Sequence, residues 1–212
     1  MENSKKGFLL PLILFFSAAA ASYFMNKFRW EGRYFLLPFI LILLPVFLDK
    51  SFRPKDFWRP GRDGFKLFFW VTLAVLLLYP PLFFGFLVKF RGAAFVTPQA
   101  GDILNGVLKG LLAIAVAAIP EEFFFRCYIQ EHILADRNKK FLGPVTQKNM
   151  ITSLLFGLIH ALAFLNITRA VTFFPSLLFG LFTEKSRGRI FYSIAFHAVS
   201  NILQFTLWTF IE

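Results

Sequence analysis

The sequence has few of the features that stabilise or solubilise a water-soluble protein. Cys127 is the only cysteine in 212 residues, which excludes an intrachain disulfide and a zinc site made of several cysteines. Charged residues make up only 17% of the chain. The sequence contains no internal repeat, no low-complexity segment and no separate soluble domain. Repeat architectures and disulfide-stabilised scaffolds are therefore excluded.

Apolar residues dominate the chain instead. Hydrophobic residues account for 57% of it, 32 residues are Phe, and the mean hydropathy is +0.62. The net charge of +11 comes from Lys and Arg that stand between apolar runs, where such residues set topology and contact lipid headgroups. We therefore predict an all-α, polytopic membrane helix bundle that has the lipid bilayer as a partner and binds no nucleic acid.

Seven apolar runs predict about seven transmembrane helices around a cavity, at residues 7–24, 34–48, 65–90, 103–134, 150–166, 171–182 and 190–211. The first run follows two lysines and resembles a signal peptide, but it is long enough to cross a membrane, and we expect it to stay as the first helix. Pro80-Pro81 is expected to interrupt the third run, and residues 136–148 form a polar loop. The chain is one membrane domain, with N-terminal helices in residues 1–102 and a core in residues 103–212.

The distribution of positive charge predicts the orientation. With the N-terminus in the cytosol, 15 of the 23 Lys and Arg residues lie in cytosolic segments and six lie on the opposite side. Loops rich in Lys and Arg stay preferentially in the cytosol. We therefore expect a multi-pass protein with a cytosolic N-terminus and a C-terminus on the other side.

Two carboxylates and a guanidinium lie inside the fourth run, in the stretch from Pro120 to Arg126. Charges at membrane depth are costly and usually mark a functional site that faces the protein interior. Glu122 and Arg126 are four residues apart, which predicts an ion pair on one helix face. Glu121 points about 100° away from Glu122 and is free for another role. A purely structural ion pair with a spare carboxylate is the alternative.

Two histidines lie in later runs, at a similar expected depth. His160 is in the fifth run and His197 is in the seventh, with Asn201 one turn further on the same face. At about 1.5 Å per residue, Glu121, His160 and His197 all lie roughly 10–15 Å below the cytosolic surface. This agreement in depth favours one shared, wet cavity open to the cytosol over separate buried histidines that satisfy local partners. His132, at the end of the fourth run, is expected to be solvated or to face the headgroups.

This set of groups can hydrolyse a peptide bond. A desolvated carboxylate is a general base near neutral pH, so Glu121 with His160 could deprotonate a water molecule. His197 and the Asn201 amide could donate hydrogen bonds to the oxyanion that forms. The sequence has no His-Glu-x-x-His, Gly-x-Ser-Gly or Gly-x-Gly-Asp motif. No cofactor is predicted. A metal is not excluded and, if one binds, Glu121, His160 and His197 are its predicted ligands.

The three motifs resemble those of a known family. Glu121-Glu122-x-x-x-Arg126, Phe156-x-x-x-His160 and His197-x-x-x-Asn201 occur in the order found in the CAAX protease and bacteriocin-processing (CPBP) family of intramembrane glutamic endopeptidases, which includes the Ras-converting CAAX endopeptidase. The resemblance covers about residues 103–205. It implies that Glu121 and His160 activate the water, that His197 and Asn201 form the oxyanion site, and that Glu122 and Arg126 support them.

The resemblance also implies a type of substrate and a location. The substrate would be a membrane-anchored or C-terminal peptide, and the protein would lie in a bacterial cytoplasmic membrane. Three Phe residues before Arg126 are similar to the myxosortase-like members that process sorting tails. A non-catalytic scaffold of the same fold and a metal-dependent variant of the protease are the alternatives. A proton-coupled transporter ranks last, because such proteins usually contain internal repeats.

Overall fold

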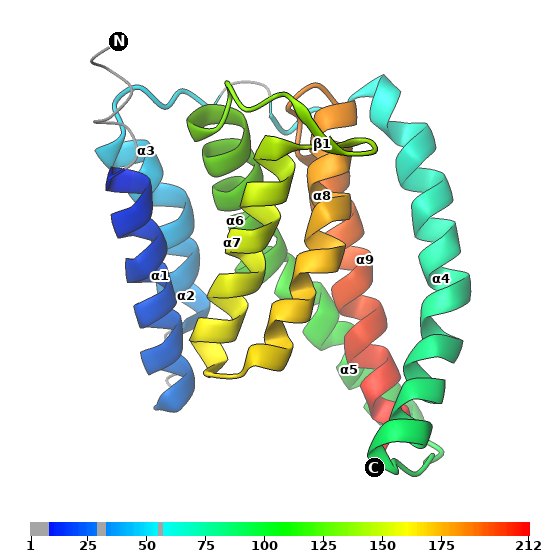
Figure 1. Ribbon diagram of the computed structural model, residues 1–212. Coiled ribbons are helices and arrows are strands. Elements are labelled where there is room, and N and C mark those ends of the chain that lie inside the picture. The colour runs from blue at the N-terminus through cyan, green and yellow to red at the C-terminus, as the bar shows by residue number, and fades with distance from the viewer. Residues whose placement is uncertain (1–8, 29–32, 55–56) are drawn as a thin grey trace.

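The computed structural model, which describes residues 9–28, 33–54 and 57–212, is a bundle of helices that run side by side (Figure 1). In chain order the elements are α1 (Leu9–Lys27), α2 (Arg33–Pro38), η2 (Phe39–Leu43), α3 (Leu44–Leu48), α4 (Arg62–Arg91), α5 (Ala100–Ala113), η3 (Ile114–Ala118), α6 (Ile119–Glu122), η4 (Phe123–Ile133), β1 (Lys140–Leu142), β2 (Val145–Thr146), α7 (Gln147–Phe164), η5 (Ile167–Thr172), α8 (Phe173–Lys185), α9 (Phe191–Leu207) and η6 (Trp208–Phe210).

Three helical segments of the described chain are long and apolar enough to cross a membrane: Leu9–Lys27, Asp63–Arg91 and Ala100–Ile133. The chain is therefore a polytopic helical membrane protein, as its composition predicts. The other predicted runs are also helical, but α7, α8 and α9 have 18, 13 and 17 residues and do not meet the same criterion. The predicted start of the first run at residue 7 and the loop residues 29–32 lie outside the described residues.

Two segments of π-helix, in which the backbone bonds reach one residue further, each precede a proline. η2 lies before Pro45, and η3 lies before Pro120. In an α-helix the proline ring would clash with the carbonyl four residues earlier, and a wider turn relieves this clash. The fourth predicted run thus stays helical from residue 100 to residue 133, with η4 as its last part.

Two local predictions were wrong. α4 continues through Pro80 and Pro81 for 30 residues without a break; helices in lipid tolerate proline, because local adjustments satisfy the few backbone groups that it frees. Residues 136–148 are not a plain loop, because β1 and β2 form a short antiparallel hairpin there, with Gly143 at a φ of 54° in its turn. The hairpin lies at one end of the bundle (Figure 1).

Aromatic side chains fill the centre of the bundle, where the polar residues of η4, α7, α8 and α9 meet. The buried core includes Phe124, Phe125, Phe156, Phe179 and Phe196, each at most 2% exposed. α1 and α4 flank this centre on opposite sides (Figure 1). Only 6% of the most apolar stretch of α4 is buried inside the bundle. Most of the surface of α4 therefore faces outward, which in a membrane means toward lipid.

Candidate active site

Glu122 and Arg126 form a fully buried ion pair. Arg126 Nε lies 3.2 Å from Glu122 Oε2, and both side chains are 0% exposed. Glu122 is the last residue of α6 and Arg126 lies in η4, and the spacing of four residues keeps them on one face of this continuous helical segment. A buried pair needs further hydrogen bonds to offset the loss of hydration, and the surrounding helices supply them.

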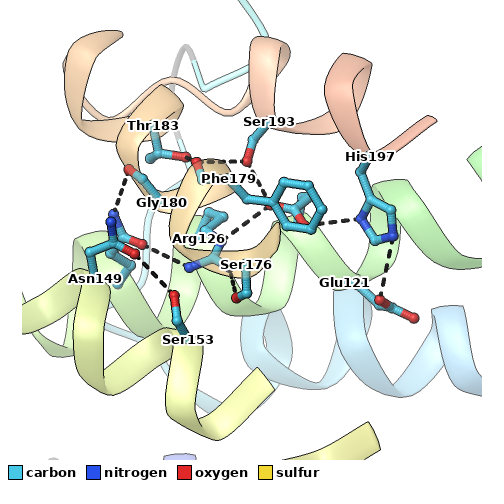
Figure 2. A network of polar contacts seen from close by, with 12 residues as sticks. Glu121, Arg126, Asn149, Ser153, Ser176, Phe179, Gly180, Thr183, Ser193 and His197 are labelled. Carbon is cyan, nitrogen blue, oxygen red and sulfur yellow. Dashed lines mark hydrogen bonds and ion pairs between the residues drawn. The ribbon is translucent and has the colours of Figure 1, made fainter. Parts of the chain in front are cut away.

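Arg126 has two further polar partners, Gln130 and Ser176, at the end of its guanidinium group. Its Nη1 donates to Gln130 Oε1 at 3.0 Å, and its Nη2 donates to the hydroxyl of Ser176 in α8. Gln130 in turn donates to the carbonyl of Gly180 at 3.2 Å. Glu122, Arg126 and Gln130 thus form a polar row with a four-residue spacing. Figure 2 shows Ser176 and Phe179 of α8 beside Arg126. The guanidinium is held in one orientation by both η4 and α8.

His197 connects the two glutamates. Its Nδ1 donates to Glu122 Oε1 at 3.0 Å, while its Nε2 lies 3.9 Å from Glu121 Oε2 (Figure 2). Ser193, one turn earlier in α9, donates to Glu122 Oε2 at 2.7 Å. A neutral imidazole that donates from Nδ1 carries a lone pair at Nε2. In its neutral form His197 therefore presents an acceptor to the side on which Glu121 lies.

His160 approaches Glu121 from α7. Its Nε2 lies 3.8 Å from Glu121 Oε2, and its Nδ1 donates to the carbonyl of Phe156 at 2.8 Å. Two imidazole nitrogens from two helices therefore face one carboxylate oxygen, at distances too long for direct hydrogen bonds. Glu121 Oε2 is buried and has no hydrogen-bond partner within the described residues. Glu122 has charged or imidazole partners at hydrogen-bond distance, whereas the partners of Glu121 Oε2 are further away.

Two phenylalanines form the walls around these groups. Phe156 packs on His160 with ring centroids 4.5 Å apart, and Phe179 stacks on His197 at 4.8 Å with an interplanar angle of 13°. The guanidinium carbon of Arg126 lies 5.9 Å from the centroids of both rings. Apolar walls of this kind strengthen electrostatic interactions at the site by lowering the local dielectric constant.

Asn201 and His132 form no hydrogen bond or ion pair with Glu121 or Glu122 among the described residues. Asn201 is half-buried, one turn beyond His197, and its side chain makes no hydrogen bond within the described part of the chain. His132 is not simply solvated, as the sequence suggested, because its Nε2 lies 3.2 Å from Asp49 Oδ2 and its ring packs on Phe52 and Tyr128. His132 therefore connects the end of η4 to the segment after α3.

The described residues contain no cluster of metal ligands, and neither of two cavities that they form lies at Glu121. Among the residues that the structure describes, no group of three or more His, Cys, Asp and Glu side chains is arranged to hold a metal ion. Two cavities of about 350 Å³ and 300 Å³ lie away from Glu121: one is between α5 and the end of α9, and the other is at the start of α4. The predicted cavity around Glu121 stays a prediction.

Residues 103–203 match the family model of the type II CAAX prenyl endopeptidase Rce1-like family. This segment of the chain is therefore similar to an Rce1-like domain. Members of this family are peptide hydrolases, which act on peptide substrates. The myxosortase-like subgroup is a finer assignment that this match does not address. The comparisons with curated proteins and with solved structures gave no match.

The matched segment begins within α5 and ends within α9, so it includes all the residues of the predicted motifs, and α1 to α4 lie outside it. Sequence reasoning missed the serine and glutamine residues that hold the ion pair. Gln130 and Ser193 had a detectable signal, because each stands four residues from a motif residue, Arg126 and His197 respectively. Ser176 has no such spacing to a motif residue, and in the sequence it is only a polar residue within an apolar run.

Proposed function

We propose that this protein is an intramembrane endopeptidase in which Glu121 and His160 activate a water molecule for attack on a peptide bond. The observation that carries the proposal is the convergence of His160 Nε2 and His197 Nε2 on the unpartnered Glu121 Oε2, at 3.8 Å and 3.9 Å. Buried polar groups that lack a protein partner are commonly bridged by water. A water molecule between these three atoms would have an acceptor for each of its protons.

The water loses a proton to Glu121, assisted by His160, as its oxygen bonds to the carbonyl carbon. Electrons of the carbonyl bond move to oxygen and form an oxyanion. His197 Nε2 and the Asn201 amide donate hydrogen bonds to this charge. His197 can donate from Nε2 only when both ring nitrogens carry a proton, and Glu122 Oε1 accepts the proton on Nδ1. The proton taken from water is finally transferred to the leaving amine as the C–N bond breaks.

Glu122 and Arg126 support the reaction without contacting the peptide. Both oxygens of Glu122 are occupied by His197, Ser193 and Arg126, so this carboxylate has little capacity to accept another proton. Its role in the proposal is to orient His197. The positive charge of Arg126 offsets one of the two buried carboxylates, which would otherwise repel each other.

The remaining parts of the proposal concern the arrangement in the membrane and the substrate. About seven helices would cross the bilayer around a catalytic cavity, with residues 103–212 as the catalytic core and residues 1–102 as N-terminal helices. The N-terminus would lie in the cytosol of a bacterial cell. The substrate would be a membrane-anchored protein or a C-terminal tail, and a sorting tail is the candidate that a myxosortase-like member would cleave.

Replacement of the proposed base tests the function directly. We expect Glu121→Gln and His160→Ala to abolish cleavage while the protein accumulates to the wild-type level. Asp136→Asn is the matched control, because it makes the same change from carboxylate to amide at an exposed residue of a polar segment. Membrane proteomics of cells that carry each variant would identify protein termini that disappear only in the Glu121→Gln and His160→Ala cells. Wild-type cleavage by Glu121→Gln would disprove the proposal.

The same experiment separates the alternatives. A non-catalytic scaffold predicts that Glu121→Gln leaves the phenotype of the cell intact. A metal-dependent protease predicts loss of cleavage after treatment with a chelator and recovery when a divalent metal ion is added back. The water-only mechanism predicts the same rate before and after chelation.

A further inference from the structure

Ser193 is a fully buried serine of α9 that no motif includes. Its hydroxyl lies 2.7 Å from Glu122 Oε2 and 2.9 Å from the carbonyl oxygen of Phe179. A serine hydroxyl has one proton to donate, and an ionised carboxylate is a stronger acceptor than a neutral carbonyl. The proton of Ser193 is therefore directed to Glu122.

Ser193 and His197 hold the same carboxylate from one helix face. They are four residues apart in α9, and each binds a different oxygen of Glu122: Ser193 binds Oε2, and His197 Nδ1 binds Oε1 at 3.0 Å. The last torsion of a glutamate side chain is soft and roughly two-fold. A single hydrogen bond would leave the carboxylate plane free to turn, whereas donors at both oxygens fix it.

The orientation of this carboxylate decides how His197 faces Glu121. Glu122 Oε1 receives the Nδ1 proton of His197, so the ring keeps Nε2 on the side of Glu121 Oε2. The guanidinium of Arg126 also contacts Oε2, but it comes from the same helical segment as Glu122. Ser193 is the contact to Oε2 that comes from the helix of His197 itself, and it therefore ties the carboxylate to the ring that it orients.

We propose that Ser193 is a positioning residue, which fixes the Glu122 carboxylate so that His197 keeps its proton on Nδ1 and directs Nε2 to the reacting atoms. This inference rests on the proposed function for its kinetic consequence only. Ser193 touches neither the substrate nor the water. Its effect on the reaction is indirect: Ser193 Oγ orients the Glu122 carboxylate, and that carboxylate orients the ring of His197.

The chain offers a matched control for the loss of this hydroxyl. Ser200 is also in α9, and its hydroxyl donates to the carbonyl of Phe196 in the same helix at 2.8 Å, without contact to Glu122. Ser200→Ala therefore removes a helix hydroxyl of the same kind. Ser193→Thr keeps a hydroxyl at the critical position and tests whether the donor, rather than the exact side chain, is what matters.

The ring of His197 can be observed without any substrate. The chain has three histidines, so 15N-histidine NMR of the purified protein in detergent micelles gives three ring systems, which His132→Gln and His160→Gln assign. We expect a strongly hydrogen-bonded proton on Nδ1 of His197 in the wild type. This proton should shift and exchange faster with water in Ser193→Ala, while Ser200→Ala leaves it unchanged. An unprotonated Nδ1 in the wild type, or identical spectra for the wild type and Ser193→Ala, would overturn the inference.

Kinetics with a peptide that spans a cleavage site found by the proteomic comparison give the second measurement. Loss of one hydrogen bond to a buried charge predicts a kcat that is roughly 10- to 100-fold lower in Ser193→Ala, with an unchanged KM. Ser193→Thr should recover most of the rate, and Ser200→Ala should keep it. A wild-type kcat in Ser193→Ala, or an equal loss in Ser200→Ala, contradicts the proposal. Activity in Glu121→Gln would refute the proposed function instead and leave the NMR result valid.

Discussion

The two adjacent glutamates differ in what surrounds each carboxylate. Glu122 has a donor at each oxygen and an arginine beside it, whereas Glu121 Oε2 is buried and faces only two imidazole nitrogens at 3.8 Å and 3.9 Å. A carboxylate that accepts hydrogen bonds at both oxygens is a weaker base, since proton uptake would disturb existing bonds. Adjacent residues of one helix can thus separate into a supporting group and a reactive group.

A second carboxylate, Asp49, has a role in stability at the end of the bundle. Burial raises the pKa of Asp49, but hydrogen bonds from Ser51 and the contact with His132 outweigh burial and lower it below its ordinary value of 3.8. A group whose pKa is depressed by folding contributes stability above its unfolded pKa, and this contribution is lost as the pH falls through the folded pKa. The contact between Asp49 and His132 should therefore persist at neutral pH and fail in acid.

This prediction can be measured by thermal unfolding in detergent. We expect Asp49→Asn to unfold at a lower temperature than the wild type at pH 6, because it lacks the carboxylate. The gap between the two proteins should narrow as the pH falls below about 4. Asp136→Asn, at an exposed position, should follow the wild type at every pH. A gap for Asp49→Asn that stays constant down to pH 3 would contradict the linkage.

The sequence predicted the charged residues of the candidate site better than the neutral ones. A four-residue spacing was enough to predict the contact between Glu122 and Arg126, because charges in an apolar helix must find partners. Ser176 was not predictable in the same way, and the four-residue spacing between Ser193 and His197 did not show that Ser193 binds Glu122. A serine in an apolar helix can satisfy itself on the carbonyl four residues earlier, as Ser200 does with Phe196. The packing of α8 and α9 around Glu122 and Arg126 decides whether a serine bonds to its own helix backbone or to one of these charged side chains.

At the scale of elements, close contact between α5 and α9 depends on two glycines. Gly106 and Gly110 are four residues apart on one face of α5, the small-residue spacing that lets membrane helices approach closely. A Cβ added at Gly110 would lie 2.5 Å from the Cα of Ile202, and one at Gly106 would lie 2.9 Å from the carbonyl oxygen of Phe205. Both obstacles are backbone atoms of α9, which cannot rotate away as a side chain can.

Gly110→Ala should therefore push α9 away from α5. Because α9 carries His197, we expect both a lower unfolding temperature and a lower rate of peptide cleavage, with an overpacking cost of about 1–3 kcal/mol. Gly85→Ala is the control, since a Cβ at Gly85 in α4 meets nothing within 4 Å. That change should be neutral or slightly stabilising, because Ala favours a helix over Gly. Equal behaviour of the two variants in a melting experiment would argue against the contact.

Element boundaries were less predictable than element types. Every predicted run that the structure describes is helical, because long apolar stretches in lipid must satisfy their backbone internally. Proline was the unreliable signal. The same residue type gives a π-helical segment before Pro120 but leaves α4 regular at Pro80 and Pro81. The difference depends on how each helix adjusts its turns, which a pattern of residue types does not specify.

At the scale of the whole molecule, the connecting segments divide between two ends of the bundle. The segments after α3, after η4 and after α8 lie at one end, and the segments after α4 and α7 lie at the other, where the C-terminus also lies (Figure 1). The charge count from the sequence assumed the same alternation of connecting segments. Among the residues that the structure describes, most Lys and Arg belong to the segments at the first end. Which end faces the cytosol stays a prediction of that asymmetry.

Cysteine labelling measures this orientation, and the chain is well suited to it. The single native thiol, Cys127, is 7% exposed, so it should react slowly with a membrane-impermeant maleimide. Asp136→Cys and Thr168→Cys place new thiols at exposed positions of opposite ends. We expect intact cells to label Thr168→Cys, and inverted membrane vesicles to label Asp136→Cys, with unmodified protein as the background. The reverse pattern would place the end that carries β1 and β2 outside the cell, and it would mean that positive charge does not set the topology of this bundle.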